Sequence, residues 1–238
     1  MNPDLYLRVR EKEGRVYTDD MVRDLPIVPD GHPFADEWKA RAASASRLRR
    51  YLARFPRRLT ILELGCGNGW LVNMLAASGH TVVGLDQNGY ELKQAARVFS
   101  TNLNSLFMEA DVFTAPFERD SFDIVILASS IQYFDDLHVL LGTLCKYLRQ
   151  QGEIHIIDSP LYRDQDVESA VERSREYYAA LGFPEMAERY FHHRLSSLTI
   201  FHPRILYQPS HRVLKIKHFL KRVDSPFPWL SIQKQNVP

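Results

Sequence analysis

Short apolar segments alternate with longer mixed segments along most of this chain. Segments rich in Val, Ile and Leu lie at residues 59–64, 81–86, 105–109, 121–128 and 152–158. Runs of this length predict buried β-strands, and the nearly continuous run at 121–128 predicts a central parallel strand covered on both faces. We therefore expect five strands of one sheet in this part of the chain.

The segments between these strands have helical character. We predict helices at 70–78 and 89–99, and a third that runs from Asp135 or Asp136 to Leu148, because either acid can cap its start. Strands that alternate with helices imply right-handed crossovers and a parallel sheet. The sequence thus indicates an α/β fold.

Further patterns lie on both sides of this region. Residues 35–55 carry an apolar stripe at three- and four-residue spacing, which predicts an amphipathic helix. The stripe consists of Trp38, Ala42, Ala45, Leu48 and Leu52. Another helix is predicted at 167–181, and two more strands at 204–208 and 229–233. The stretch 183–203 gives no readable pattern and is treated as an insertion.

Three glycines spaced by two follow the first predicted strand. Gly65, Gly67 and Gly69 lie between the apolar run Ile61–Leu64 and the helix that follows. Glycine is required where the backbone turns with positive φ or approaches a ligand closely. The free N–H groups of the next helix then point at the ligand. The segment predicts a binding site for a nucleotide-type cofactor.

The positions of these glycines separate two classes of cofactor. A dinucleotide fingerprint G-x-G-x-x-G that starts at Gly65 requires a third glycine at position 70, which is Trp70. Glu63, two residues before the first glycine, would repel a pyrophosphate and suits a cationic ligand. A nicotinamide-dependent oxidoreductase is therefore disfavoured. S-adenosylmethionine, which carries a sulfonium and an ammonium group, fits better.

The chain resembles the class I S-adenosylmethionine-dependent methyltransferases, whose first motif is acid-x-Gly-x-Gly-x-Gly. Glu63, Gly65, Gly67 and Gly69 match this motif, and the resemblance covers residues 59–160. It implies a doubly wound, mostly parallel sheet of seven strands with helices on both faces and an antiparallel last strand. It also implies S-adenosylmethionine as the cofactor and S-adenosylhomocysteine as the product.

The resemblance assigns cofactor contacts residue by residue. Asp86, at the end of the second strand, would accept the ribose hydroxyls, and Asp111 with the Val112 N–H would contact the adenine. Gln87 stands where the family commonly has an apolar residue against the adenine. The predicted cofactor site consists of Glu63, Gly65, Cys66, Gly67, Asn68, Gly69, Asp86, Gln87, Asp111, Val112, Ala128 and Ser129.

Composition agrees with one globular enzyme domain. The length of 238 residues suits a single α/β domain, in which we expect residues 1–58 to be an N-terminal extension with a cover helix and residues 59–238 to be the cofactor-binding part. Charge is balanced, with 30 Lys and Arg against 29 Asp and Glu. Two cysteines suggest neither a disulfide framework nor a zinc cluster, and no metal site is expected. The polar start and the lack of a membrane-length apolar run favour a cytoplasmic location without membrane contact. A homodimer is compatible with the sequence.

The segment after the fourth strand bears on the methyl acceptor. Family members that methylate nucleic-acid amines have an Asn or Asp, two prolines and an aromatic residue there, whereas this chain has Ala128-Ser129-Ser130-Ile131. The carbonyl that would accept a proton from a base amine is thus missing, as is the stacking aromatic ring. An aminopropyltransferase is disfavoured by the lack of an acid. A small organic acceptor is favoured, with oxygen, nitrogen and carbon all open as the methylated atom.

Candidate catalytic residues are few, because positioning alone can supply much of the rate of methyl transfer. Tyr133 follows the fourth strand, where family substrates approach, with Gln132 beside it. His192, His193 and His202 lie in a region that this fold often uses as a lid, and histidine suits general-base work. A further group, Tyr6, Tyr17 and Trp38, is a candidate cover over the cofactor, although for Trp38 a core position is favoured. For Asp158, at the end of the fifth strand, we favour a turn role.

Two other functions are compatible with the sequence. RNA modification is suggested by a basic segment without acids between Glu37 and Glu63, which 215–222 would extend. Its arginines are Arg41, Arg47, Arg49, Arg50, Arg54, Arg57 and Arg58. A solvated helix face is the simpler interpretation, so a nucleic-acid partner is not expected. A cofactor-binding protein without transferase activity is the second alternative.

Overall fold

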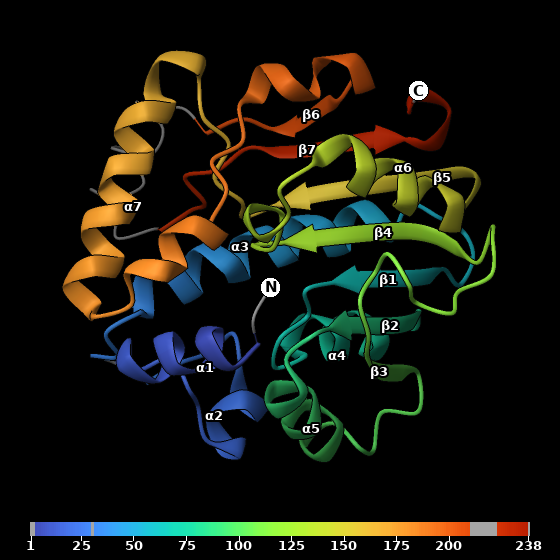
Figure 1. The fold of residues 1–238 in the computed structure, drawn as a ribbon. Helices are drawn as coiled ribbons and strands as arrows, with labels where there is room; N and C mark the ends of the chain where they lie inside the picture. The colour runs from blue at the N-terminus through green and yellow to red at the C-terminus, as the bar shows by residue number, and fades with distance from the viewer. Residues whose placement is uncertain (1–2, 30, 210–222, 238) are drawn as a thin grey trace.

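One seven-stranded sheet forms the centre of the molecule. The computed structural model describes residues 3–29, 31–209 and 223–237. The strand order is β3-β2-β1-β4-β5-β7-β6, and only β7 runs antiparallel to its neighbours. In Figure 1 the carboxyl ends of the parallel strands point toward α1 and α7. The expected fold class, with an antiparallel last strand, is confirmed.

The strands fall on the predicted segments. They are β1 (Thr60–Leu64), β2 (Thr81–Asp86), β3 (Ser105–Glu109), β4 (Phe122–Ala128), β5 (Leu148–Ile157), β6 (Arg204–Tyr207) and β7 (Trp229–Gln233). The one clear difference is the start of β5, which was expected at Gly152. The pairing shifts between Phe122 and Ile124, so a bulge accommodates the exposed polar residues 149–151.

Helices pack on both faces of the sheet. One face is covered by α3 (Ala35–Leu52), α4 (Trp70–Ala77) and α5 (Gly89–Val98), and the other by α6 (Leu137–Tyr147). Neighbouring residues of β4 serve opposite faces, because Ile124 packs with the first group and Val125 with the second. This two-sided burial explains the nearly continuous apolar run of the central strand.

Local caps account for some of the helix boundaries. Asp136 caps α6, because its Oδ1 accepts the N–H groups of His138 at 2.8 Å and Val139 at 3.0 Å. The helix predicted at 167–181 is α7 (Val167–Leu181), which ends at Gly182 with φ 87°. Helix α3 ends three residues earlier than predicted, at Leu52.

The N-terminal cover has more structure than the sequence revealed. It contains α1 (Pro3–Lys12) and α2 (Asp19–Asp24) in addition to α3. The stretch 183–203 forms two 3₁₀ helices, η3 (Pro184–Arg189) and η4 (Leu195–Phe201), and η3 packs on α7. In Figure 1, α1 and α7 lie beside the carboxyl edge of the sheet. Within the described ranges, no helix is long and apolar enough to span a membrane.

Candidate functional site

The glycine loop after β1 has the conformation that only glycine adopts easily. Gly65 and Gly67 have φ values of 76° and 49°. Gly65 donates its N–H to the Leu85 carbonyl at 2.8 Å, which fixes the loop to the end of β2. A Cβ on Gly65 would lie 2.5 Å from the Cβ of Ser130. The loop therefore leaves no room for a side chain at this position.

Gly69 has a different structural role. Its φ is 74° and it is the N-cap of α4. A Cβ there would lie 2.4 Å from a ring carbon of Phe107 and 2.8 Å from the Cβ of Ala95. Gly69 thus allows α4 to pack closely against β3 and α5. It is not among the residues that line the two cavities described next.

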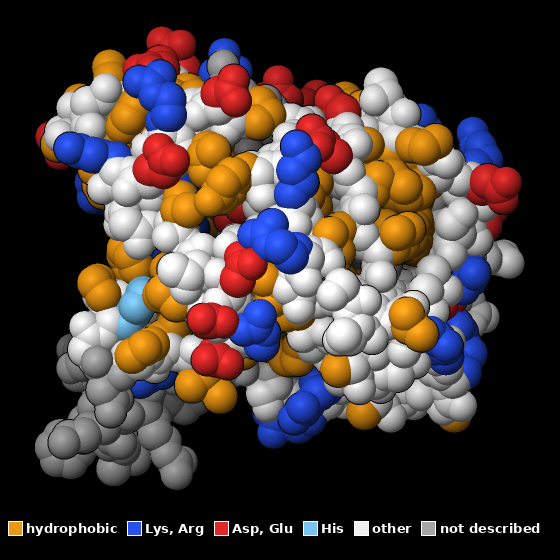
Figure 2. Space-filling view, turned by 90° about the horizontal axis from the view of Figure 1, so that it is seen from below, with side chains coloured by type: hydrophobic (Ala, Val, Ile, Leu, Met, Phe, Trp, Pro, Cys, Tyr) orange, Lys and Arg blue, Asp and Glu red, His pale blue; other side chains and the backbone are white. Residues whose placement is uncertain are grey.

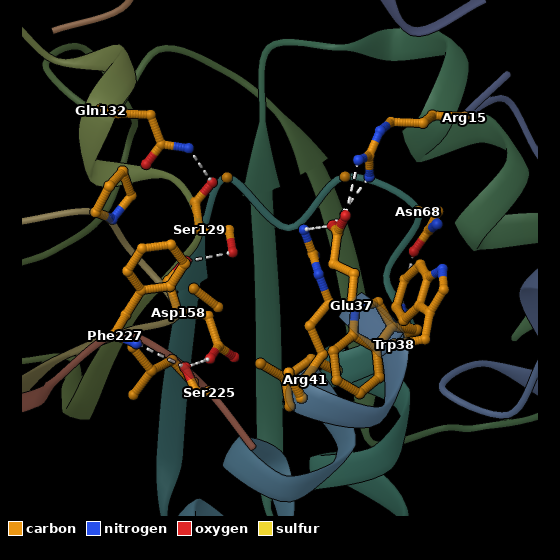
Figure 3. Close-up of a pocket in the computed structure, with 18 of the residues that line it drawn as sticks. Arg15, Glu37, Trp38, Arg41, Asn68, Ser129, Gln132, Asp158, Ser225 and Phe227 are labelled. Carbon is orange, nitrogen blue, oxygen red and sulfur yellow. Dashed lines mark hydrogen bonds and ion pairs between the residues drawn. The ribbon is translucent and has the colours of Figure 1, made fainter. Parts of the chain in front are cut away.

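A cavity of about 770 Å³, here called the main cavity, lies at the carboxyl ends of β1, β4 and β5. This volume is within the ~300–1,000 Å³ typical of small-molecule sites. Figure 3 shows Ser129, Asp158 and Ser225 on one side, and Glu37, Arg41 and Arg15 on the other. Seven of the predicted cofactor residues line it: Glu63, Gly65, Cys66, Gly67, Asn68, Ala128 and Ser129.

A smaller cavity of about 80 Å³, the side cavity, continues toward the end of β2. Asp86, Gln87 and Val112 line it, and it shares Gly65, Gly67, Ser129, Tyr6 and Tyr133 with the main cavity. The predicted ribose and adenine positions are therefore next to the glycine loop. Asp111 is the exception, because it is exposed and its Oδ1 accepts the N–H of Phe113 at 2.9 Å.

Asp86 connects the end of β2 to the glycine loop. Its two carboxylate oxygens accept the N–H of Gly67 at 2.8 Å and the N–H of Asn88 at 2.9 Å. Burial raises the pKa of Asp86, and these backbone donors oppose the effect. The carboxylate can hold the loop and still offer lone pairs to a ligand. The ribose contact itself stays a prediction.

Glu63 is a buried acid without a complete set of partners. Only 3% of the residue is exposed, and Oε2 has no hydrogen-bond partner in the described part of the chain. Burial, and then the charge of Asp86, raise the pKa of Glu63 well above its ordinary value. An unsatisfied buried acceptor is costly, so its place in the wall of the main cavity fits a ligand that carries a cation or a donor.

The catalytic candidates divide into two groups. Tyr133, in the 3₁₀ helix η1 (Ile131–Tyr133), lines both cavities. His192, His193 and His202 are not among the lining residues. His192 bonds Ser174 Oγ at 2.8 Å. The ring of His193 bonds the Ile131 carbonyl at 3.1 Å, and burial lowers its pKa.

His202 has no comparable place near the site. It is exposed, has φ 46° and ends η4. The three histidines fall in the sequence region that was expected to form a lid, but tertiary packing gives the half-buried His192 and the buried His193 other partners. A catalytic role for Tyr133 or for any of these histidines stays a prediction.

Two arginines from the N-terminal part share one acid in the wall of the cavity. Glu37 accepts two bonds from Arg15, at 2.9 and 2.7 Å, and one from Arg41 at 2.8 Å (Figure 3). Burial raises the pKa of Glu37, but the arginines outweigh this effect and lower it to about 2. Sequence reasoning placed Arg41 in a solvated basic segment, because it could not show which acid faces that side of α3.

Asp158 also lines the main cavity, which the sequence did not favour. Its Oδ1 accepts the hydroxyls of Ser44 and Ser225, each at 2.7 Å. Burial raises the pKa of Asp158, opposed by these two hydroxyls. A carboxylate with this environment suits proton transfer or recognition of a polar acceptor.

Tyrosines form much of the wall above the strand ends. Tyr6 contacts Tyr133 with 5.7 Å between ring centroids, and Tyr133 contacts Tyr190 at 6.0 Å. Tyr178 of α7 contacts Tyr190 at 6.1 Å. All four line the main cavity together with Tyr162. Tyr17 lines the cavity as well, and its hydroxyl accepts the Trp38 Nε1–H at 3.1 Å. Their role as a cover over the cofactor stays a prediction.

Comparison with known proteins gives independent information on this site. Residues 62–156 match the family described as "Methyltransferase domain". A demethylmenaquinone methyltransferase from Thermus thermophilus is 33% identical over 126 residues, which cover 52% of this chain and 54% of that protein. A ubiquinone biosynthesis O-methyltransferase from Bartonella tribocorum is 30% identical over 97 residues, covering 40% of this chain and 38% of that protein. The chain thus spans about half or less of these curated relatives.

Solved structures show the same fold over nearly the whole chain. A geranyl diphosphate C-methyltransferase from Streptomyces coelicolor A3(2), in complex with Mg²⁺, geranyl diphosphate and S-adenosyl-L-homocysteine, has a TM-score of 0.63 at 14% identity. The match covers 98% of this chain and 99% of that one. A methyltransferase from Methanosarcina mazei has a TM-score of 0.54 at 15% identity, covering 77% and 96%. The family match and the curated relatives support a class I S-adenosylmethionine-dependent methyltransferase, and the solved structures show the same fold.

Proposed function

We propose that this protein transfers the methyl group of S-adenosylmethionine to a small organic acceptor bound in the main cavity. The observation that carries the proposal is the continuity of this cavity. It joins the glycine loop to a chamber that extends to Tyr162, Tyr178 and Asp158, beyond the predicted cofactor residues. An acceptor in that chamber would lie beside the methyl donor, as in-line transfer requires.

The fit of the cofactor is supported by the unsatisfied polar atoms in the wall. Glu63 Oε2 and Gln132 Oε1 are buried acceptors without partners among the described residues. When bound, S-adenosylmethionine supplies an activated methyl group. Its ammonium group could donate hydrogen bonds to these two oxygen atoms, Glu63 Oε2 and Gln132 Oε1. The remaining catalytic work of this chain is to orient the acceptor and exclude water.

The walls of the chamber support the acceptor class. Tyr178 and Tyr190 offer ring faces to an unsaturated or apolar body, and Asp158 offers a carboxylate to a hydroxyl or amine. The names of the curated relatives point to quinone precursors and a malonyl thioester as their own acceptors. A cytoplasmic location, a homodimer and the division at residue 58 remain proposals.

RNA as the acceptor is less well supported. Arg41 is bound to Glu37, and Arg47 and Arg57 form ion pairs with Asp224 at 2.6 Å and Asp123 at 2.8 Å. The basic segment is thus partly neutralised, and 215–222 lies outside the described residues. On the face seen in Figure 2, acidic and basic side chains are intermixed.

The first experiment is calorimetric titration with S-adenosylhomocysteine, with NAD as the rival ligand. We expect binding of S-adenosylhomocysteine and none of NAD, and at about 100 times Kd a stabilisation of ~2.7 kcal/mol. Methyl-labelled S-adenosylmethionine is then incubated with phenols, carboxylic acids and amines, and separately with RNA. Label in a small molecule supports the proposal.

Two results would contradict it. Binding of NAD alone would refute the cofactor. Label recovered only in RNA would refute the acceptor class. Binding of S-adenosylhomocysteine without transfer to any acceptor would favour the non-catalytic alternative.

A further inference from the structure

The wall of the main cavity includes a guanidinium group, that of Arg10, which lacks hydrogen-bond acceptors on one edge within the described residues. Arg10 projects from α1, and its Nη1 donates to Glu13 Oε2 at 3.2 Å. Its Nε is buried and has no acceptor within the ranges that the structure describes, and Nη2 has no bond there either. The Nε–Nη2 edge of a guanidinium is a fork that matches the two oxygens of a carboxylate.

Arg10 is held in place by its own helix and by α7. Glu13 binds Arg10 and lies 3.4 Å from Arg15 Nε. The hydroxyl of Tyr177 donates to the other Glu13 oxygen at 2.6 Å. The guanidinium carbon lies 5.6 Å from the centroid of the Tyr6 ring. These contacts hold the guanidinium at the cavity wall, while its Nε–H is covered and unsatisfied, which is costly for a buried donor.

The position of Arg10 relates it to the glycine loop. Its electrostatic neighbours include Tyr133 and Glu91. Glu91 lies close to the glycine loop: a Cβ added to Gly67 would lie 3.4 Å from Glu91 Oε2. Arg10, Glu91 and Gly67 all line the main cavity, so Arg10 shares this cavity with the loop that is assigned to the methionine end of the cofactor.

The unsatisfied atoms in the cavity wall have the chemistry of an amino-acid site. Arg10 Nε is a donor that requires an anionic or polar acceptor, and Glu63 Oε2 and Gln132 Oε1 are acceptors that require a donor. An α-amino acid presents a carboxylate and an ammonium group on one carbon. Within the proposed cofactor, only the methionine end carries both groups.

We propose that Arg10 binds the carboxylate of the methionine end of S-adenosylmethionine through its Nε–Nη2 edge. This inference rests on the proposed function. It makes α1 a part of the cofactor site, although α1 lies outside residues 62–156 that match the methyltransferase domain. The last side-chain torsions of Arg10 must adjust for this edge to reach the carboxylate, because Nε is covered.

The test compares two ligands that differ in the amino-acid end. S-adenosylhomocysteine carries the carboxylate, and 5′-deoxy-5′-methylthioadenosine lacks the whole amino-acid part. Both are titrated calorimetrically into the full chain and into Arg10→Gln. We expect the variant to bind S-adenosylhomocysteine about 10- to 150-fold more weakly, which corresponds to ~1.5–3 kcal/mol for a hydrogen-bonded charge. Its affinity for methylthioadenosine should change less than about 2-fold.

Two further variants complete the design. Arg8→Gln removes a charge from the same helix, where Arg8 is exposed and lies over the Phe183 ring at 5.1 Å, outside the cavity. It should bind both ligands like the wild type. Arg10→Lys keeps the charge but loses the fork, so its loss for S-adenosylhomocysteine should be intermediate. If Arg10→Gln does not fold, the Arg10→Lys variant tests by itself whether Arg10 binds the carboxylate.

Each contrary outcome has its own meaning. Equal weakening of both ligands would show that Arg10 only supports the cover and would overturn the inference. Unchanged affinity for S-adenosylhomocysteine would overturn it as well. If the wild type bound neither ligand, the proposed function itself would fail, and the carboxylate assignment with it.

Discussion

Ser129 Oγ donates a hydrogen bond of 2.7 Å to the backbone carbonyl of Asp158, and both residues have positive φ, 55° and 49°. Neither is glycine, so both backbones are strained. They follow β4 and β5 directly and line the main cavity. The carboxyl ends of the two central strands are thus fixed to each other at the point where an acceptor would meet the cofactor.

Substitutions at Ser129 separate this strain from the hydrogen bond. Ser129→Ala keeps the strained φ and loses the bond, so we expect the free energy of unfolding to fall by about 0.5–1.5 kcal/mol. Ser129→Gly also loses the bond but relieves the strain, so it should be more stable than the Ala variant. Urea denaturation of the ligand-free protein measures both. A Gly variant less stable than the Ala variant would argue against backbone strain.

Asp86→Ala should affect both the cofactor and the fold. The substitution removes the predicted ribose acceptor, so affinity for S-adenosylhomocysteine should fall at least ~10-fold. It also leaves the N–H groups of Gly67 and Asn88 without their carboxylate partner. The structure therefore predicts a loss of stability of about 1–3 kcal/mol. Calorimetry and urea denaturation measure the two effects separately.

Two glycine substitutions test how tightly α4 is packed. Gly69→Ala places a Cβ 2.4 Å from the Phe107 ring at φ 74°, so we expect a destabilisation of about 1–3 kcal/mol. Gly142→Ala is the matched control, because it lies within α6 and no atom is within 4 Å of the added Cβ. It should stabilise the protein by ~0.5–1 kcal/mol. Thermal unfolding of both variants checks the pair, and a stable Gly69→Ala variant would refute the close contact.

Glu63→Gln should raise the stability of the protein and lower its affinity for S-adenosylhomocysteine. Burial raises the pKa of Glu63, so the folded protein binds a proton more tightly than the unfolded chain, whose carboxyl titrates near ~4.3. As the pH rises above this unfolded-state pKa, the free energy of unfolding of the wild type falls, and it stops falling once the pH exceeds the pKa of Glu63 in the folded state. The Gln variant has no such loss, because its side chain does not titrate. The variant should therefore gain stability relative to the wild type as the pH rises above about 4.

The affinity of the same variant should change in the opposite direction. Glutamine cannot neutralise the ammonium group, so S-adenosylhomocysteine should bind more weakly at pH 7. Thermal unfolding at several pH values, with calorimetry at pH 7, measures both effects. A stability difference that is independent of pH would contradict the raised pKa of Glu63.

The sequence by itself determined the α/β fold and the glycine loop. Strands and helices of the central region are encoded by local patterns, and the run at 229–233 coincides with β7. Gly65 and Gly67 could be recognised because positive φ and close approach are requirements of the backbone alone. The family relationship followed from those short-range signals.

Only the tertiary structure decided which side chains line the main cavity. Arg10, Glu37 and Asp158 come from three separate segments and share one cavity because the strand ends, α1 and α3 meet there. Local sequence patterns do not predict which distant segments come into contact, because the side of a helix that faces a cavity depends on long-range packing. For the same reason His192 and His193, which resemble catalytic residues in sequence, bind Ser174 and the Ile131 carbonyl instead.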